Sequence, residues 1–240
     1  MMHALALIPA KHRSERLPDK HSRRVGGRSL VGWALHLAEE ARRIGLVQDI
    51  LAVTDTAWVP EYFQGLPAGA YCVNQPEATA LGVGATLRWL LTERFDDRPC
   101  AWDTALILYP TSPLRTLRHL VEARLLLEEG WDGVLSVTPY RQDPRWAVGL
   151  LGPDGEVRRA PIAAWGREPL PPEQVGPLWK ADGTALWVRT EAFLAKAKPP
   201  DWFYALRLRA YRMDRMESVD VDHEDDLVLA EALLQRREAP

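Results

Sequence analysis

Short apolar runs alternate with longer amphipathic stretches, and this alternation constrains the fold of the 240-residue chain more than any other feature. The apolar runs predict strands over residues 4–8, 49–54, 70–73, 104–109 and 132–138. Apolar residues recur at helical spacing over 29–44, 82–95 and 116–129. Such alternation is typical of parallel strands joined by right-handed crossovers, with helices on both faces. The sequence therefore predicts a Rossmann-like α/β fold with a mostly parallel sheet.

The alternation stops between residues 139 and 180, a stretch rich in Pro, Trp and Arg. Within it, "GLLGPDGEV" (149–157) predicts a hairpin built on a Pro-Asp-Gly turn. A strand and a helix follow over 183–196, and a last strand with an acidic-capped helix over 217–237. We expect one domain over residues 1–240, in which 139–180 forms an irregular inserted lobe that serves as a lid, acceptor wall or dimer contact.

Composition excludes several classes of protein. The chain carries 30 Lys and Arg against 33 Asp and Glu, a net charge of −3, which argues against an electrostatic nucleic-acid binder. Its two cysteines, Cys72 and Cys100, match no zinc-binding spacing and indicate thiols in a reducing compartment. No apolar stretch reaches the roughly 18 residues of a membrane span, and the start lacks a signal-peptide pattern. We expect a cytoplasmic protein.

Positive charge is concentrated in "LIPAKHRSERLPDKHSRRVGG" (7–27), directly after the first predicted strand. In sheets of this type, ligands bind beyond the carboxyl ends of the strands. A phosphate-rich ligand needs cations and hydrogen-bond donors, which the loop offers in Lys11, Arg13, Ser14, Arg16 and Lys20. The alternative is a solvated basic loop, since the segment matches neither GxxxxGK[ST] nor GxGxxG.

The segment "VDVD" (219–222) places Asp220 and Asp222 two residues apart on a predicted strand, so both would point to one face. Two adjacent carboxylates repel each other, and a hard cation such as Mg²⁺ relieves that repulsion. The alternative is that Asp222 caps the following helix, whose first turn is acidic.

The segment "YPTSPLR" (109–115) follows a buried strand and supplies Thr111, Ser112 and Arg115 around two prolines. A rigid loop with hydroxyl groups at this place suits a sugar or a base. The alternative is the start of a helix that Thr116 caps.

Four segments together, in this order, span nearly the whole chain: "LIPAKHRSERLPDKHSRRVGGRSLVGWAL", "LYPTSPLR", "DGTALWV" and "VDVDHEDDLVLAEALL". They resemble the cytidylyltransferases that activate acidic sugars, in particular the acylneuraminate cytidylyltransferases. Residues 139–180 show little likeness. The resemblance implies a fold of the nucleotide-diphospho-sugar transferase type.

For the opening loop, the resemblance implies nucleotide binding by Ala10, Lys11, Ser14, Arg16 and Lys20, with Gln75 at a further nucleotide position. Lys11, Arg16 and Lys20 would be the catalytic cations that hold the triphosphate and stabilise the leaving pyrophosphate. Lys11 stands where the family usually has Arg. Glu15 stands where these enzymes usually have a second Lys, so that Arg16 would supply the missing charge.

For the rest of the site, the resemblance implies substrate binding by Thr111, Ser112, Arg115 and Asp182, and Mg²⁺ binding by Asp220 and Asp222. Asp182 stands where the family has Asn. Gln75, Gly82 and Tyr109 replace an Arg, an Asp and a Gln of the family. This sequence thus matches the family's pattern better at the phosphate and metal positions than at the positions expected to recognise base or sugar.

The resemblance implies transfer of CMP from CTP to the anomeric hydroxyl of an acidic 2-keto sugar, with release of pyrophosphate. It also implies a homodimer with residues 139–180 at the contact. Two other hypotheses remain open at this point. One is another sugar-nucleotide transferase with an Asp-x-Asp pair. The other is a non-catalytic nucleotide-binding protein, consistent with the replaced recognition residues.

Overall fold

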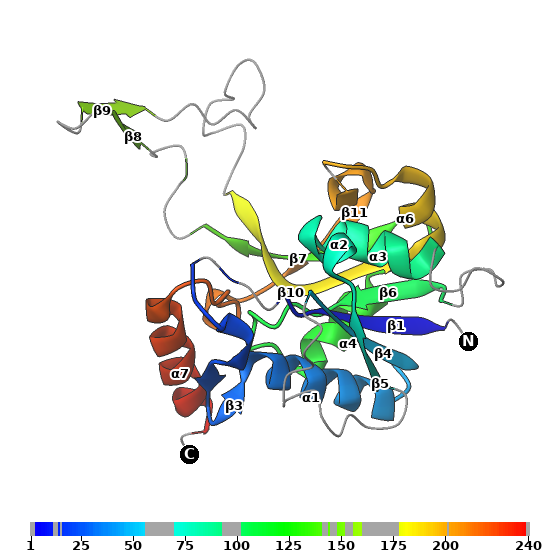
Figure 1. The fold of residues 1–240 in the computed structure, drawn as a ribbon, viewed down its shortest axis with the longest axis horizontal. Coiled ribbons are helices and arrows are strands. Elements are labelled where there is room, and N and C mark those ends of the chain that lie inside the picture. The colour runs from blue at the N-terminus through cyan, green and yellow to red at the C-terminus, as the bar shows by residue number, and fades with distance from the viewer. Residues whose placement is uncertain are drawn as a thin grey trace.

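The computed structural model describes residues 3–11, 14, 16–55, 70–92, 102–140, 144, 148–151, 156–159, 178–200 and 202–238. A seven-stranded sheet forms its centre (Figure 1). Its strands are β1 (Ala4–Pro9), β4 (Asp49–Thr54), β5 (Ala70–Asn74), β6 (Thr104–Ile107), β7 (Gly133–Pro139), β10 (Trp179–Arg189) and β11 (Leu208–Arg212). The helices are α1 (Leu30–Arg43), α2 (Pro76–Ala80), α3 (Val83–Thr92), α4 (Leu117–Leu125), α6 (Thr190–Lys196) and α7 (Glu224–Glu238).

The strands lie in the order β11-β7-β10-β6-β1-β4-β5. Adjacent strands are parallel except at β10, which runs antiparallel to both β6 and β7. The prediction of a mostly parallel Rossmann-like sheet is therefore confirmed. From β1 the chain adds β4 and β5 on one side and then returns to place β6 on the other. The carboxyl ends of β1 and β6 thus meet where the direction of winding reverses, the position at which such sheets bind ligands.

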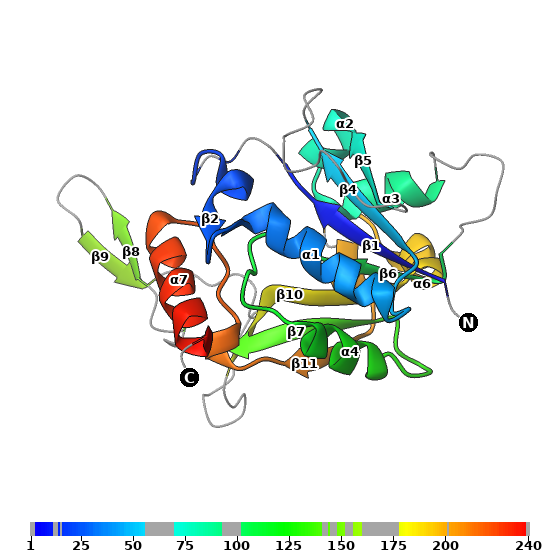
Figure 2. The same ribbon diagram turned by 90° about the horizontal axis from the view of Figure 1, so that it is seen from below.

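Strand β1 shows how the sequence produces two core layers. Ala4, Ala6 and Ile8 pack with α1 and α4 on one face, whereas Leu5 and Leu7 pack with α3 and α6 on the other. A strand buried on both faces reads as an unbroken apolar run, as "ALALI" does. Figures 1 and 2 show the sheet lying between these two helical layers.

A third apolar cluster joins the first loop to the last helix. Leu17, Val25 and Leu114 pack against Val221 and α7. Strands β2 (Arg24–Val25) and β3 (Arg28–Ser29) form a small hairpin between the opening loop and α1. Gly26 and Gly27 have φ of 57° and 74°, values a two-residue hairpin turn requires and glycine adopts without strain. The Gly26 N–H donates to Glu231 of α7 (2.6 Å), which ties the loop to that helix.

The predicted strand at 217–222 is wrong. Residues Arg215–Glu217 form a 3-10 helix, η6, and the backbone from 218 to 223 belongs to no strand. The apolar alternation has a different cause: Val219 and Val221 are buried in the third cluster, while the backbone lies beside a loop and not beside a strand. The last strand of the chain is β11, an edge strand for which no prediction was made.

Within residues 139–180, the predicted hairpin is present as β8 (Val148–Leu151) and β9 (Glu156–Arg159), which pair antiparallel. Figure 1 shows this two-stranded sheet apart from the central one. The predicted Pro-Asp-Gly turn and most of the predicted lobe lie outside the described residues.

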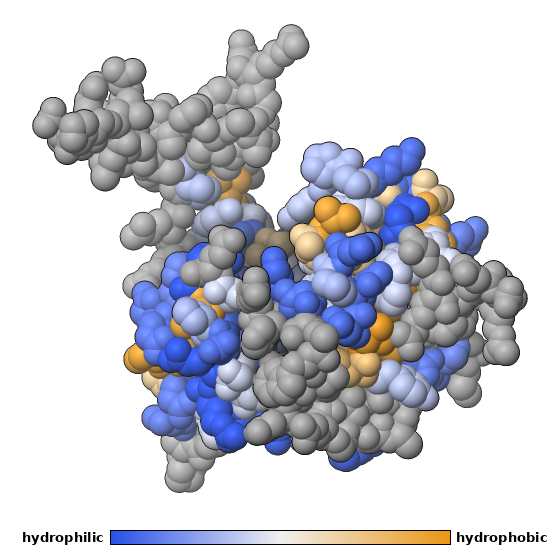
Figure 3. Space-filling view, in the orientation of Figure 1, coloured by the Kyte–Doolittle hydropathy of each residue, from blue (hydrophilic) through white to orange (hydrophobic). Residues whose placement is uncertain are grey.

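Hydrophobic residues on the face shown in Figure 3 form small separate patches among hydrophilic ones. Of the helices that the structure describes, none has the length and apolar character needed to cross a membrane.

Candidate functional site

A cavity of about 320 Å³ lies at the carboxyl ends of β1 and β6. We call it the phosphate cavity. It brings together six residues predicted from the sequence: Lys11, Arg16, Lys20, Thr111, Asp220 and Asp222. These residues come from three separate segments of the chain, and the fold collects them at one point.

Asp222 forms the ionic centre of the phosphate cavity. Its two carboxylate oxygens accept from Lys20 Nζ at 2.9 Å and from Arg16 at 2.8 Å. Lys20 is well fixed, with a side chain only 13% exposed, whereas the Arg16 side chain is 59% exposed. Two basic residues of the loop therefore have a defined acidic partner, which disfavours the interpretation of the loop as a purely solvated segment.

Asp226, and not Asp222, closes the first turn of α7. Its carboxylate accepts from the backbone N–H groups of Asp222 (2.9 Å) and His223 (2.8 Å). A side chain in the first turn that reaches back in this way satisfies donors that the helix leaves unpaired. The Asp222 carboxylate thus pairs with Lys20 and Arg16, and Asp226 fills the helix-capping role that the sequence offered as the alternative for Asp222.

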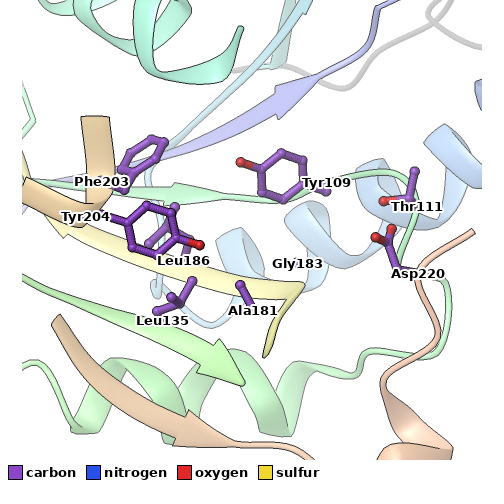
Figure 4. A pocket seen from close by; sticks show the side chains of 9 residues that line it. All are labelled: Tyr109, Thr111, Leu135, Ala181, Gly183, Leu186, Phe203, Tyr204 and Asp220. Carbon is purple, nitrogen blue, oxygen red and sulfur yellow. The ribbon is translucent and has the colours of Figure 1, made fainter. Parts of the chain in front are cut away.

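Asp220 lies beside Asp222 and contacts the loop after β6. The Val221 N–H donates to the Thr111 carbonyl oxygen (2.8 Å), and the Thr111 hydroxyl faces the Asp220 carboxylate (Figure 4). Although Asp220 is exposed on the rim of the cavity, the surrounding protein raises the pKa of its carboxyl by desolvation, and the Asp222 charge raises it further. An added cation would relieve this cost.

The carboxylate pair fits a divalent cation. Mg²⁺ is usually held by one or two protein carboxylates together with substrate phosphates and water. Asp220 and Asp222 supply two carboxylates on the rim of the phosphate cavity. Among the described residues no cluster of three or more His, Cys, Asp or Glu side chains is suited to a metal, so phosphate and water oxygens would complete the coordination.

A second cavity, of about 260 Å³, adjoins the first. Tyr109, Phe203 and Tyr204 wall it with their rings, and Leu135 and Leu186 line its floor (Figure 4). We call it the aromatic pocket. Thr111 and Asp220 border both cavities. Burial, with the nearby Tyr204 and Asp220, raises the pKa of Tyr109, so this phenol stays protonated at neutral pH.

Ser112, Arg115 and Asp182 are buried behind the two cavities and line neither. The Asp182 carboxylate accepts from the Ser136 hydroxyl and from the Thr184 N–H (3.0 Å), and Arg115 donates to the Thr184 carbonyl oxygen (3.4 Å). Desolvation lowers the pKa of Arg115 to about 9, and the Asp182 charge opposes that shift. The structure therefore places these residues where they support the loop after β6 and the wall of the aromatic pocket.

Three further predicted nucleotide-binding residues, Ala10, Ser14 and Gln75, lie outside the lining of the phosphate cavity. Ala10 is buried, and its N–H donates to the Val53 carbonyl oxygen (2.8 Å). Ser14 accepts from the Leu17 N–H (3.4 Å) within the opening loop. Gln75 precedes α2 and donates from its N–H to the Thr54 carbonyl oxygen (2.8 Å). None of the three lines the phosphate cavity, and Glu15 lies outside the described residues.

Sequence reasoning missed two parts of the site. Helices α2 and α3 contribute Thr79, Val83 and Thr86 to the phosphate cavity. They lie beside Gly82, which also lines the cavity and which the resemblance had already placed at a recognition position. Phe203 and Tyr204 come from η5 (Trp202–Ala205), a short 3-10 helix between α6 and β11. The aromatic run "WFY" at 202–204 is a signal that could have indicated a ligand-facing segment.

An α/β sheet with a basic loop, a carboxylate pair and an adjoining pocket at its ligand edge is typical of the nucleotidyltransferase class. Comparison with curated proteins agrees. The chain is 25% identical over 256 residues to the CMP-N,N'-diacetyllegionaminic acid synthase of Legionella pneumophila, covering 98% of this chain and 97% of that protein. It is 26% identical over 240 residues to an N-acylneuraminate cytidylyltransferase of Streptococcus agalactiae, covering 95% of this chain but 52% of that longer protein.

Solved structures with the same fold include CMP:2-keto-3-deoxy-manno-octonic acid synthetase complexed with CTP (TM-score 0.64, 16% identity, 98% of this chain and 99% of that one). Another is 2-C-methyl-D-erythritol 4-phosphate cytidylyltransferase from Thermus thermophilus (TM-score 0.62, 18% identity, 98% and 100%). No family model matches the chain. The resemblance to acylneuraminate cytidylyltransferases is confirmed, and the protein is an enzyme of the nucleotidyltransferase class.

Proposed function

We propose that the protein transfers CMP from CTP to the anomeric hydroxyl of an acidic 2-keto sugar and releases pyrophosphate. One observation carries the proposal: Asp220 and Thr111 border both the basic phosphate cavity and the aromatic pocket. A nucleotide and an acceptor bound in these neighbouring cavities would meet at the Asp220–Asp222 pair. The relatives that activate acidic sugars support this reading of the two cavities.

In the proposed reaction the acceptor oxygen forms a bond to the α-phosphorus as the bond to the bridging oxygen of pyrophosphate breaks. The hydroxyl proton leaves to solvent, and the leaving group carries the displaced electron pair. Catalysis of such transfers consists mainly of positioning and neutralisation of charge. Lys11, Arg16 and Lys20 surround the phosphate cavity and would neutralise the negative charge of the triphosphate and of the leaving pyrophosphate.

Asp222 gives the loop cations a partner before nucleotide binds. A triphosphate in the cavity would take over Lys20 and Arg16 as counter-ions, which frees the Asp222 carboxylate to face the cation together with Asp220. Mg²⁺ held by these two carboxylates would supply charge neutralisation at the phosphates and would lower the pKa of the attacking hydroxyl.

The carboxylate pair is tested by Asp222→Ala, with Asp225→Ala as the matched control. Asp225 is an exposed acid in the first turn of α7, outside both cavities. We expect Asp222→Ala to abolish Mg²⁺-dependent turnover with the far-UV circular dichroism unchanged, and Asp225→Ala to retain turnover. Unchanged turnover in Asp222→Ala would contradict the metal assignment.

The triphosphate role of the loop is tested by Lys20→Ala. Loss of one charge-assisted hydrogen bond corresponds to about 1.5–3 kcal/mol, or roughly 10- to 100-fold in affinity. We expect that loss for CTP and a much smaller one for CMP, measured by titration calorimetry. Equal losses for both nucleotides would argue against contact with the β- and γ-phosphates. Lys196→Ala, at the ion pair between α6 and Asp132, serves as the control.

The same resemblance leads us to propose a homodimer that uses residues 139–180. Light scattering of the full chain and of a variant in which a short glycine-serine linker replaces residues 141–177 would test this. A dimer that persists in the shortened variant would place the contact elsewhere.

A further inference from the structure

The lining of the phosphate cavity and of the aromatic pocket leaves open which residue binds the carboxylate of the acceptor. This question rests on the proposed function. In the ring form of a 2-keto sugar acid, one carbon carries both the anomeric hydroxyl and the carboxylate. A hydroxyl that reacts beside Asp220 therefore brings a second negative charge within a few ångströms of that carboxylate. Such a charge needs a cation on the acceptor side of Asp220.

The cations already described are not available for this task. Lys11, Arg16 and Lys20 line the phosphate cavity, and two of them hold Asp222. Arg115, which the sequence suggested as a substrate-binding residue, is 6% exposed and lines neither cavity. A different cation must face the acceptor.

Lys180 has the required position. It lies on β10, paired with Thr138 of β7, and is exposed to solvent. Together with Asp220 it borders a third cavity, a groove of about 1,020 Å³ whose described lining includes no residue of the opening loop. Asp220 is thus common to all three cavities.

The next residue of β10, Ala181, lines the aromatic pocket. Asp220 borders both that pocket and the groove that Lys180 lines, so an acceptor that reaches from the pocket across Asp220 into the groove would have Lys180 beside its reacting centre. Among the residues that the structure describes, none forms an ion pair with Lys180. A cation that none of these described residues pairs with can bind a ligand carboxylate without giving up an ion pair to them.

We propose that Lys180 binds the carboxylate of the acceptor sugar and holds it beside Asp220. The proposal makes Lys180 a substrate-binding residue that separates acidic acceptors from neutral ones. The carboxylate would lie toward the groove, and the remainder of the sugar would lie in the aromatic pocket.

The test compares Lys180→Gln, Lys180→Arg and, as a matched control, Arg215→Gln. Arg215 is an exposed cation that borders the same groove, but it lies in η6 and not on β10. The acceptor is whichever sugar acid the wild-type enzyme turns over fastest. We expect Lys180→Gln to raise its KM by about 10- to 100-fold, with less than about twofold change in the KM for CTP. Lys180→Arg should recover most of the loss, and Arg215→Gln should behave as wild type.

A second readout uses the carboxamide of the same sugar, which removes the acceptor charge. The wild-type enzyme should prefer the acid strongly, and Lys180→Gln should lose most of that preference. An unchanged acceptor KM, an undiminished preference for the acid, or an equal loss in Arg215→Gln would overturn the role of Lys180. A wild-type protein that releases no pyrophosphate with any sugar acid would instead overturn the proposed function, and the acceptor role with it.

Discussion

Asp220 combines an unfavourable electrostatic position with a place on the rim of three cavities. Desolvation and the neighbouring Asp222 raise the pKa of its carboxyl, so the ionised form costs folding free energy at neutral pH. A group that destabilises the fold and borders every cavity of the site is more readily explained by function than by stability.

We predict that Asp220→Asn raises the melting temperature at pH 8 and abolishes turnover. Because the raised pKa belongs to the folded state, the advantage over wild type should be complete above that pKa. This advantage in melting temperature should shrink as the pH falls below the raised pKa toward the ordinary pKa range of Asp. Thermal unfolding followed by circular dichroism between pH 4 and pH 8 measures this difference. A lower melting temperature at pH 8, or retained activity, would contradict the account.

Arg115 and Asp182 are opposite charges buried behind the site, and the Asp182 charge helps to keep Arg115 ionised. We predict that Asp182→Asn lowers the free energy of unfolding by about 1–3 kcal/mol, because the buried guanidinium loses its counter-charge. The double variant Arg115→Met/Asp182→Asn should lose less than the sum of the single changes, as urea denaturation would show. Additive losses would mean that the two charges are not coupled.

At the scale of elements, α3 and η5 meet at one glycine. A Cβ atom on Gly84 would lie 2.4 Å from the Trp202 ring, and that ring stacks on Phe193 at 6.1 Å between centroids. The next two residues after Trp202 wall the aromatic pocket. The close approach at Gly84 therefore sets the position of that wall.

We predict that Gly84→Ala destabilises the fold by about 1–3 kcal/mol through overpacking and raises the acceptor KM more than the CTP KM. Steady-state kinetics with each substrate varied in turn would separate the two effects. An acceptor KM equal to that of wild type would show that the wall does not depend on this contact.

The sequence predicted the central elements well because their signals are local. Strand β4 has the predicted bounds, 49–54, and α1 begins one residue after the Ser29 that caps it. Strand β11 gave no such signal, because an edge strand reading "LRAYR" buries little besides Tyr211. At 219–222 the alternation was real, but its cause was the packing of two valines against α7. Periodicity reports which side chains are buried, and it does not report what the backbone pairs with.

At the scale of the whole molecule, local sequence signals predicted some parts of the site, whereas other parts depend on how distant segments meet. The basic loop and the carboxylate pair could be predicted because each lies within one short segment. The aromatic pocket could not, since β7, β10 and η5 are distant in sequence and meet only in the fold. Lys180 belongs to this second group, as its position beside Asp220 depends on how β10 pairs with β7.

In the proposed function, the two cavities bring a nucleotide and an acidic sugar together for reaction. The most direct measurement is the yield of pyrophosphate and of CMP-sugar when the wild-type protein is mixed with CTP, Mg²⁺ and each of a panel of 2-keto sugar acids. We expect equimolar release of the two products with at least one acid, and none when CTP, the acid or Mg²⁺ is omitted. Stabilisation by CTP without either product, for every acid tried, would contradict the proposed function and favour a protein that only binds nucleotide.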